Sequence, residues 1–211
     1  NHSTRVYDSM LELLSNEENP TPIVRLNRVT PYVHTRVYAK LEWYNPFGAV
    51  KDRVAANLVA DAEARGETLD NLVEPTSGNT GMGLAMMANA RGYHFTATLS
   101  RAIPLEKRQA LRLFGTNLIE LDDDLCPMPG QPEGAMVRAQ TMGEQPGWKS
   151  LNQYKNPANP DAHFRTTGPE IWRQTDGAIT HFVAGLGTCG TITGTGRFLK
   201  EKNKGVKVMG V

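Results

Sequence analysis

Cysteine and histidine are scarce in this chain of 211 residues. The two cysteines, Cys126 and Cys189, lie far apart in no metal-like spacing, and the five histidines are scattered. These absences argue against a disulfide scaffold and against a metal site. We therefore expect a reduced, cytoplasmic protein that binds no metal.

Long hydrophobic runs and tracts of one charge are lacking as well. The 23 basic and 22 acidic residues are interspersed and sum to a net charge of +1, which gives no electrostatic case for binding nucleic acid or a membrane. No run approaches the length of a membrane span, and we expect no signal peptide. Hydrophobic residues make up 39% of the chain, which predicts a globular protein with a real core.

Short apolar runs alternate with segments of helical periodicity along most of the chain. The predicted strands are 23–26, 36–41, 71–74, 94–99, 117–121, 148–151, 181–184 and 207–211. The predicted helices are 7–14, 51–64, 81–91, 105–114, 134–142, 164–175 and 191–202. Residues 122–134 are rich in Asp, Pro and Gly and predict an exposed loop. The alternation predicts an α/β fold with a largely parallel sheet.

A lysine, Lys51, opens the helix that follows the turn at residues 45–48. The positive end of a helix dipole disfavours a cation in the first turn and so favours the neutral amine. A neutral amine is the form that attacks a carbonyl group. Taken alone, Lys51 is more simply a solvated lysine at a helix start, next to Asp52.

Three polar loops follow predicted strands, at the edge where open parallel sheets bind their ligands. Residues 76–81 offer hydroxyls and amides that suit a carboxylate, with a plain Ser/Thr helix cap as the alternative. Residues 185–191 combine glycines, hydroxyls and a helix start, as a phosphate cradle does, with a plain turn as the alternative. Residues 153–160 contain two Asn-Pro pairs and predict a structural loop, from which Gln153 could reach a carboxylate.

Together these motifs resemble the cysteine synthase family of pyridoxal phosphate (PLP) enzymes, which includes O-acetylserine and O-phosphoserine sulfhydrylases and cystathionine β-synthases. The resemblance runs from about residue 19 to residue 211, through residues 21–26, 45–53, 74–81, 153–171 and 187–191. It implies a fold-type II architecture, similar to the tryptophan synthase β subunit, with two three-layer α/β domains and mostly parallel sheets.

The resemblance also implies how the chain is divided. Residues 1–150 would form the N-terminal domain and residues 151–211 an incomplete C-terminal domain, because the family continues beyond Val211. Residues from about 20 to 44 would cross to the other domain. Residues from about 96 to 142 would be mobile.

Roles for individual residues follow from the same resemblance. Lys51 would bind PLP covalently and act as the catalytic base, and Asn79 would bond the 3′ oxygen of the PLP ring. The residues that would hold the PLP phosphate are Gly187, Thr188, Cys189, Gly190 and Thr191. The residues that would hold the substrate carboxylate are Thr76, Ser77, Gly78, Thr80 and Gln153.

The implied activity is PLP-dependent β-replacement, in which a sulfur donor reacts with O-acetylserine or O-phosphoserine to give cysteine. Condensation with homocysteine is an alternative, because residues 153–156 also resemble cystathionine β-synthases. An inactive paralogue that serves as a binding or regulatory partner is a second alternative, because Ala49 stands where the family usually has Ser or Thr. A small-molecule amino acid and a sulfur donor would be its substrates, and we expect a homodimer.

Overall fold

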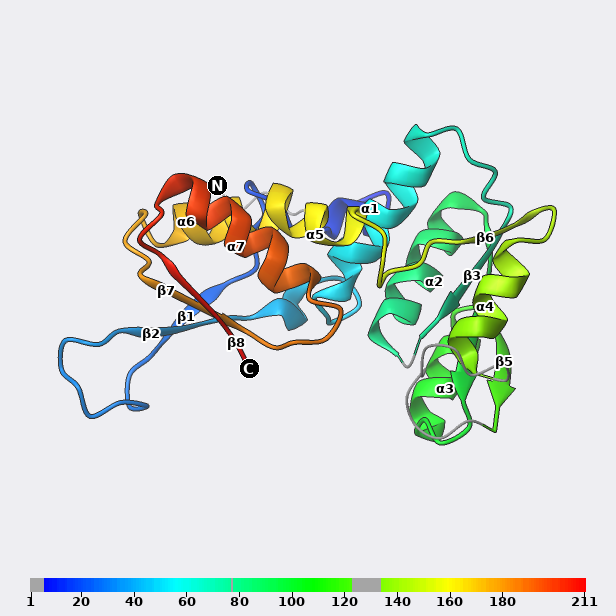
Figure 1. The fold of residues 1–211 in the computed structure, drawn as a ribbon, viewed down its shortest axis with the longest axis horizontal. Coiled ribbons are helices and arrows are strands. Elements are labelled where there is room, and N and C mark those ends of the chain that lie inside the picture. Colours follow the sequence, from blue (N-terminus) through cyan, green and yellow to red (C-terminus); the bar gives the residue numbers. More distant parts are fainter. Residues whose placement is uncertain (1–5, 77, 123–133) are drawn as a thin grey trace.

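The computed structural model describes residues 6–76, 78–122 and 134–211, which have an α/β fold (Figure 1). A four-stranded parallel sheet has the strand order β5-β4-β3-β6. Its strands are β3 (Asn71–Pro75), β4 (His94–Ser100), β5 (Asn117–Leu121) and β6 (Trp148–Ser150). Central strand β3 pairs Val73 with Thr96 on one side and with Ser150 on the other. Ser77, Cys126 and most of the loop predicted at 122–134 lie outside the described residues.

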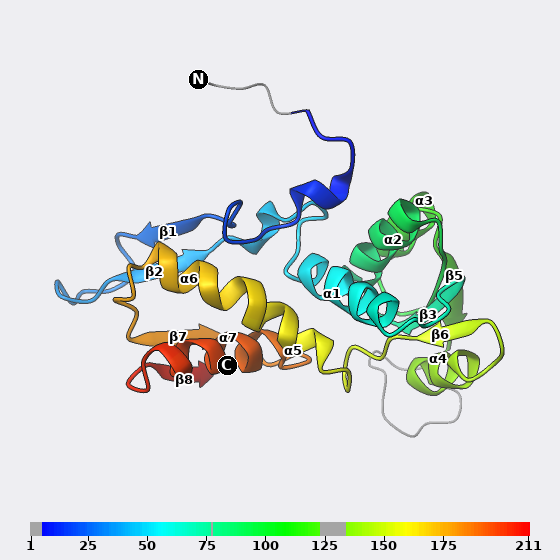
Figure 2. The ribbon, with the colours of Figure 1, turned by 90° about the horizontal axis from the view of Figure 1, so that it is seen from above.

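Helices cover both faces of this sheet and form a three-layer arrangement (Figure 2). The helices are α1 (Lys51–Ala64), α2 (Asn79–Arg91), α3 (Leu105–Leu113) and α4 (Ala135–Gly143). Successive side chains of a strand point to opposite faces, so Leu72 packs in the cluster of α1 and α2, while Val73 packs against α4. Both side chains are almost fully buried.

The remaining elements gather on the other side of the molecule (Figures 1 and 2). Two strand pairs lie here: β1 (Ile23–Leu26) antiparallel to β2 (Val37–Lys40), and β7 (His181–Ala184) parallel to β8 (Lys207–Gly210). The helices are α5 (Ala158–Ala162), the π-helix η3 (His163–Thr167), α6 (Gly168–Gln174) and α7 (Gly190–Lys202). A small core of Ile171, Leu199 and Val206 joins them, with Ile23 packed against it.

Most of the predicted strands and helices are confirmed to within about two residues, but two predictions are wrong. The helix predicted at 7–14 is only a 3₁₀ turn, η1 (Met10–Leu13), which Ser9 and Glu12 cap. A second 3₁₀ turn, η2 (Glu42–Tyr44), follows β2. The segment predicted as a loop up to Pro160 becomes helical at Ala158. A proline is tolerated there because the first helical amides need no partner within the helix.

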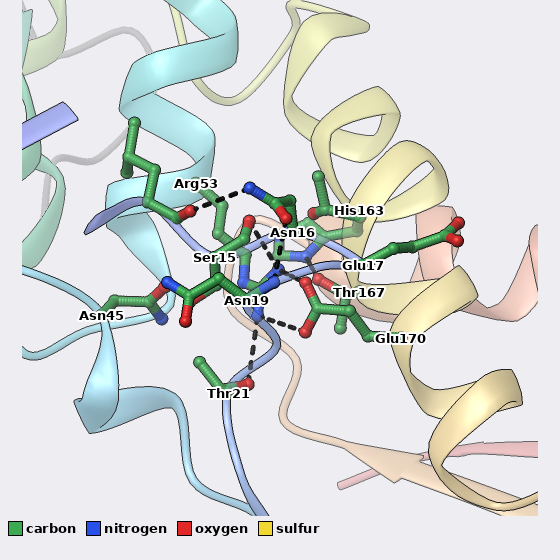
Figure 3. Close-up of polar contacts among 12 residues, drawn as sticks. Ser15, Asn16, Glu17, Asn19, Thr21, Asn45, Arg53, His163, Thr167 and Glu170 are labelled. Atoms are coloured by element: carbon green, nitrogen blue, oxygen red, sulfur yellow. Dashed lines mark hydrogen bonds and ion pairs between the residues drawn. The ribbon is translucent and has the colours of Figure 1, made fainter. Parts of the chain in front are cut away.

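A buried ion-pair cluster links α1 to the second group of elements (Figure 3). The Arg53 guanidinium donates to both carboxylate oxygens of Glu170 in α6, at 2.5 and 2.8 Å, and to Glu42 at 2.8 Å. Lys40 also bonds Glu170, at 2.7 Å, and Thr21 accepts from Arg53 at 3.1 Å. These contacts fix the helix that carries Lys51 against α6.

Within the described ranges, no helix combines the length and the apolar character that a bilayer crossing would need.

Candidate active site

Lys51 is the first residue of α1 and is half-buried. The first turn of α1 is packed tightly by α2: a Cβ added at Gly83 would lie 2.8 Å from the Ala55 Cβ and 3.1 Å from the Lys51 carbonyl oxygen. Asp52, fully buried, accepts the amide of Phe47 at 2.6 Å and so holds the preceding turn. Burial raises the pKa of the Asp52 carboxyl to about 6.

The environment of Lys51 favours its neutral amine. Burial lowers the pKa of the Lys51 amine below its ordinary value, and Cys189 opposes the shift only in part. The amide dipoles at the start of α1 disfavour the cation as well. The Lys51 amine therefore loses its proton more readily than a solvated lysine does.

Lys51 reaches across the molecule to the glycine-rich loop that precedes α7. Its Nζ donates to the Thr188 hydroxyl at 2.9 Å, although the two residues are 137 positions apart in the sequence. The loop ends at the N-terminus of α7, where the first backbone amides have no acceptor within the helix. Beside Gly185 and Gly187 a Cβ would meet nothing within 4 Å, so the loop faces open space.

The cavity next to this loop has a volume of about 120 Å³ and is polar. Segment 153–160 forms one wall and residues 188–193 form the other. Free amides, hydroxyls and a helix N-terminus make this a site for an anion. Cys189 adopts a left-handed conformation with a φ of 62°, and its side chain is exposed.

Two of the residues predicted to hold a substrate carboxylate contact each other. The Thr80 hydroxyl donates to the Gln153 side-chain oxygen at 2.6 Å, and both residues are buried. The Gln153 amide also donates to the Pro75 carbonyl at 3.2 Å. Thr76 instead organises its own loop, because its hydroxyl accepts the amides of Gly78 and Gly81 at 3.3 and 2.9 Å.

Asn79 is placed differently from these residues. It is the first residue of α2, after Gly78, and its side chain is exposed. Among the described residues, no hydrogen bond joins Asn79 to the other predicted site residues. Ser77, also predicted to hold the substrate, lies outside the described residues. The described residues contain no group of His, Cys, Asp and Glu side chains that could bind a metal ion.

Three buried residues that support this site had no role in the sequence-based prediction. Glu74, at the end of β3, accepts the amides of Asn152 and Gln153 at 2.9 and 2.8 Å. Asn159 bonds both Gln153 and Thr188. Glu74 begins the matched segment 74–81, and Asn159 lies in the second Asn-Pro pair of segment 153–160, so both lay inside motifs whose other residues were given roles.

His163 is the third of these residues, and the π-helix η3 carries it into the interior. Its Nδ1 lies 2.9 Å from the Thr167 hydroxyl (Figure 3). Its Nε2 lies 3.3 Å from the Thr191 hydroxyl. Burial lowers the pKa of His163 to about 3, and the nearby charges of Arg53 and Lys51 act in the same direction. His163 is therefore neutral at physiological pH and contacts Thr191 of the glycine-rich loop.

A reactive lysine amine beside an anion cradle, at the end of an α/β sheet, defines an enzyme of the class that binds a phosphorylated carbonyl cofactor. The family described as pyridoxal-phosphate dependent enzyme matches residues 14–211. The chain belongs to this family, as the sequence analysis predicted.

Individual relatives show which members of this family the chain is similar to. Cysteine synthase B of Salmonella typhimurium strain LT2 is 47% identical over 193 residues, covering 90% of this chain and 62% of that protein. O-ureido-L-serine synthase of Streptomyces lavendulae is 42% identical over 207 residues, covering 97% of this chain and 61% of that protein. The crystal structure of cysteine synthase from Entamoeba histolytica covers the whole chain and 62% of its own, with a TM-score of 0.86 and 33% identity. The chain thus spans about 62% of the length of the first of these relatives.

The residues of the site fit PLP. Its aldehyde reacts with an unprotonated amine, a form that the lowered pKa of Lys51 favours. Its phosphate requires amides and hydroxyls in a concave site, which the glycine-rich loop and Thr188 supply at the cavity wall.

Proposed function

We propose that the protein makes cysteine by PLP-dependent β-replacement on an activated serine, either O-acetylserine or O-phosphoserine, with a sulfur nucleophile. The observation that carries the proposal is the contact of Lys51 with Thr188, which joins the reactive amine to the anion cradle. The similarity to cysteine synthases of types A and B supports the choice of reaction.

In this proposal the residues of the chain divide the work. Lys51 holds PLP covalently, and residues 187–191 hold its phosphate with their amides and hydroxyls. PLP, when bound, supplies an electron sink for the negative charge that forms on the substrate carbon. Asn79, at the start of α2, would bond the ring, and residues 76–80 with Gln153 would hold the substrate carboxylate.

Lys51 has a second task, the transfer of a proton at the substrate Cα. A general base must be unprotonated before it can accept a proton. Burial lowers the pKa of the Lys51 amine, so a larger fraction is neutral near physiological pH.

Replacing Lys51 with Ala tests the assignment. The purified full-length Lys51→Ala protein should lose the visible absorbance of covalently bound PLP and should form no cysteine from O-acetylserine or O-phosphoserine with sulfide. Lys204→Ala, which removes an exposed lysine, is the matched control and should keep both. If the Lys51→Ala protein kept both, Lys51 would not be the cofactor lysine.

Synthesis of O-ureido-L-serine is a second candidate function. A synthase of this name matches 97% of the chain, and a crystal structure of an O-ureido-L-serine synthase superimposes with a TM-score of 0.85 at 41% identity. Assaying the wild-type protein for O-ureido-L-serine alongside cysteine separates the two activities.

We also propose a homodimer of two-domain subunits, divided near residue 150, as the assembly in which the site functions. Residues from about 20 to 44 would cross to the domain that follows residue 150, and two hydrogen bonds support this crossing. Lys40 of β2 donates to Gln174 of α6 at 2.9 Å, and Gln174 donates to the Thr21 carbonyl at 2.8 Å. Residues from about 96 to 142 would be the part that moves when substrate binds.

A further inference from the structure

Asn159, the second residue of α5, connects two segments of the site with one side chain. Its Nδ2 donates to the Gln153 carbonyl at 2.9 Å and to the Thr188 hydroxyl at 2.8 Å. A side-chain amide nitrogen carries two protons, so these two bonds use both. The residue is only 1% exposed, and its bond to the Gln153 carbonyl is buried, while its bond to Thr188 lies at the wall of the polar cavity.

The Thr188 hydroxyl receives a second donor. Lys51 Nζ donates to the same oxygen at 2.9 Å. A hydroxyl oxygen has two acceptor lone pairs and one proton. With both lone pairs occupied, the Thr188 proton must point away from Asn159 and Lys51, and Thr188 lines the polar cavity. The hydroxyl is therefore available as a donor to an acceptor in that cavity.

Packing fixes the Asn159 side chain in this orientation. A Cβ at Gly190 would lie 1.9 Å from Asn159 Oδ1, so glycine is required at the start of α7 for Asn159 to fit. The neighbouring turn is tied to α1, because Asn57 donates to the Ala158 carbonyl at 2.7 Å. Turning the amide over would place Oδ1 against the Gln153 carbonyl oxygen, which is repulsive.

We propose that Asn159 is a positioning residue that acts through Thr188, holding the Thr188 hydroxyl as a hydrogen-bond donor to the phosphate of PLP. The inference rests on the proposed function in one respect, that PLP is the ligand of this cavity. Asn159 keeps its bond to Thr188 whether or not the Lys51 amine is free, so its effect persists when the cofactor is bound.

A comparison of two ligands tests the inference in the full-length protein. PLP and pyridoxal share the aldehyde that Lys51 would bind, but only PLP carries the phosphate. Dissociation constants for both are measured by spectroscopic titration of the wild type, Asn159→Ala, Thr188→Val and the double variant. Asn159→Ala should weaken PLP binding roughly ten- to a hundredfold, as for a lost hydrogen bond to a charged group, and should weaken pyridoxal binding much less.

The coupling between Asn159 and Thr188 in PLP binding, measured with the double variant, is the decisive measurement. If Asn159 acts through the Thr188 hydroxyl, adding Asn159→Ala to Thr188→Val should cause no further phosphate-specific loss. Asn159→Asp has nearly the same volume beside Gly190 but cannot donate, so it should also show the phosphate-specific loss. Asn57→Ala perturbs the same turn without touching Thr188 and should affect both ligands equally.

Contrary outcomes are distinct from a failure of the proposed reaction. An equal loss of PLP and pyridoxal affinity in both Asn159 variants would show that Asn159 only holds the loop and would overturn the inference. Additive phosphate-specific losses in the double variant would overturn it as well, as would a wild type that binds PLP no more tightly than pyridoxal. A wild type that binds PLP and forms no cysteine would overturn the proposed reaction and leave the role of Asn159 standing.

Discussion

Glu74 shows how a single buried carboxylate organises the substrate side of the site. It is fully buried at the end of β3 and accepts the backbone amides of Asn152 and Gln153. Burial raises the pKa of the Glu74 carboxyl from 4.5 to about 7, although these hydrogen bonds oppose the shift. The raised pKa shows that desolvation outweighs the hydrogen bonds at this position.

Stability should consequently fall as pH rises through this range. Between pH 4.5 and pH 7 the folded state binds the Glu74 proton more tightly than the unfolded state, so deprotonation favours unfolding. The contribution is greatest below about pH 4.5 and is lost above about pH 7. Glu74→Gln has no titrating group here, so its stability relative to wild type should rise by about 3 kcal/mol between pH 4.5 and pH 7.5.

Urea unfolding of both proteins at the two pH values measures this difference. Asp52 also titrates with a raised pKa, but it is present in both proteins and its contribution cancels. A difference in stability that stayed constant with pH would mean that Glu74 titrates normally.

Among the elements, α1 and α6 are joined by the buried pair of Arg53 and Glu170. Their side chains are 1% and 0% exposed. Arg53→Ala removes the bidentate partner of the buried Glu170 carboxylate and leaves it paired with Lys40 alone, so it should cost about 3 kcal/mol of unfolding free energy. Arg65→Ala, which breaks an exposed pair with Asp61 just after α1, should cost no more than about 1 kcal/mol.

Chemical denaturation of the two variants provides the comparison. Comparable losses in both would show that the cluster around Arg53 stabilises no more than a surface ion pair.

The sequence predicted the elements better than it predicted what joins them. Apolar patterns located the strands, because a strand buried on one face alternates apolar and polar residues and a strand buried on both faces is a continuous apolar run. Arg53 and Glu170 are 117 positions apart, and no local pattern pairs them. The turn at residues 163–167 follows a π-helical path, for which the sequence has no periodic signature, and this path places His163 inside. Charged and amide residues are usually exposed, so burial of Glu74 and Asn159 was not expected either.

Across the whole molecule, the Lys51 contact joins the elements around the four-stranded sheet to those around β7 and β8. A ligand held by both groups stabilises the folded state by an amount that grows with the logarithm of its concentration relative to its dissociation constant. At a PLP concentration one hundred times its dissociation constant, the full-length protein should gain about 2.7 kcal/mol of stability. Thermal unfolding at increasing PLP concentrations measures this gain. An unfolding temperature that did not change with PLP concentration would contradict it.

The bonds from Glu74 to segment 150–153 have a consequence for how such a site diversifies. Glu74 accepts from main-chain amides, which every residue except proline possesses. Residues 152 and 153 are therefore held through their main chain, and the side chains of Tyr154 and Lys155, both exposed at the cavity, take no part in these two bonds. Substitutions at these two positions would change the lining of the cavity while leaving both bonds of Glu74 in place.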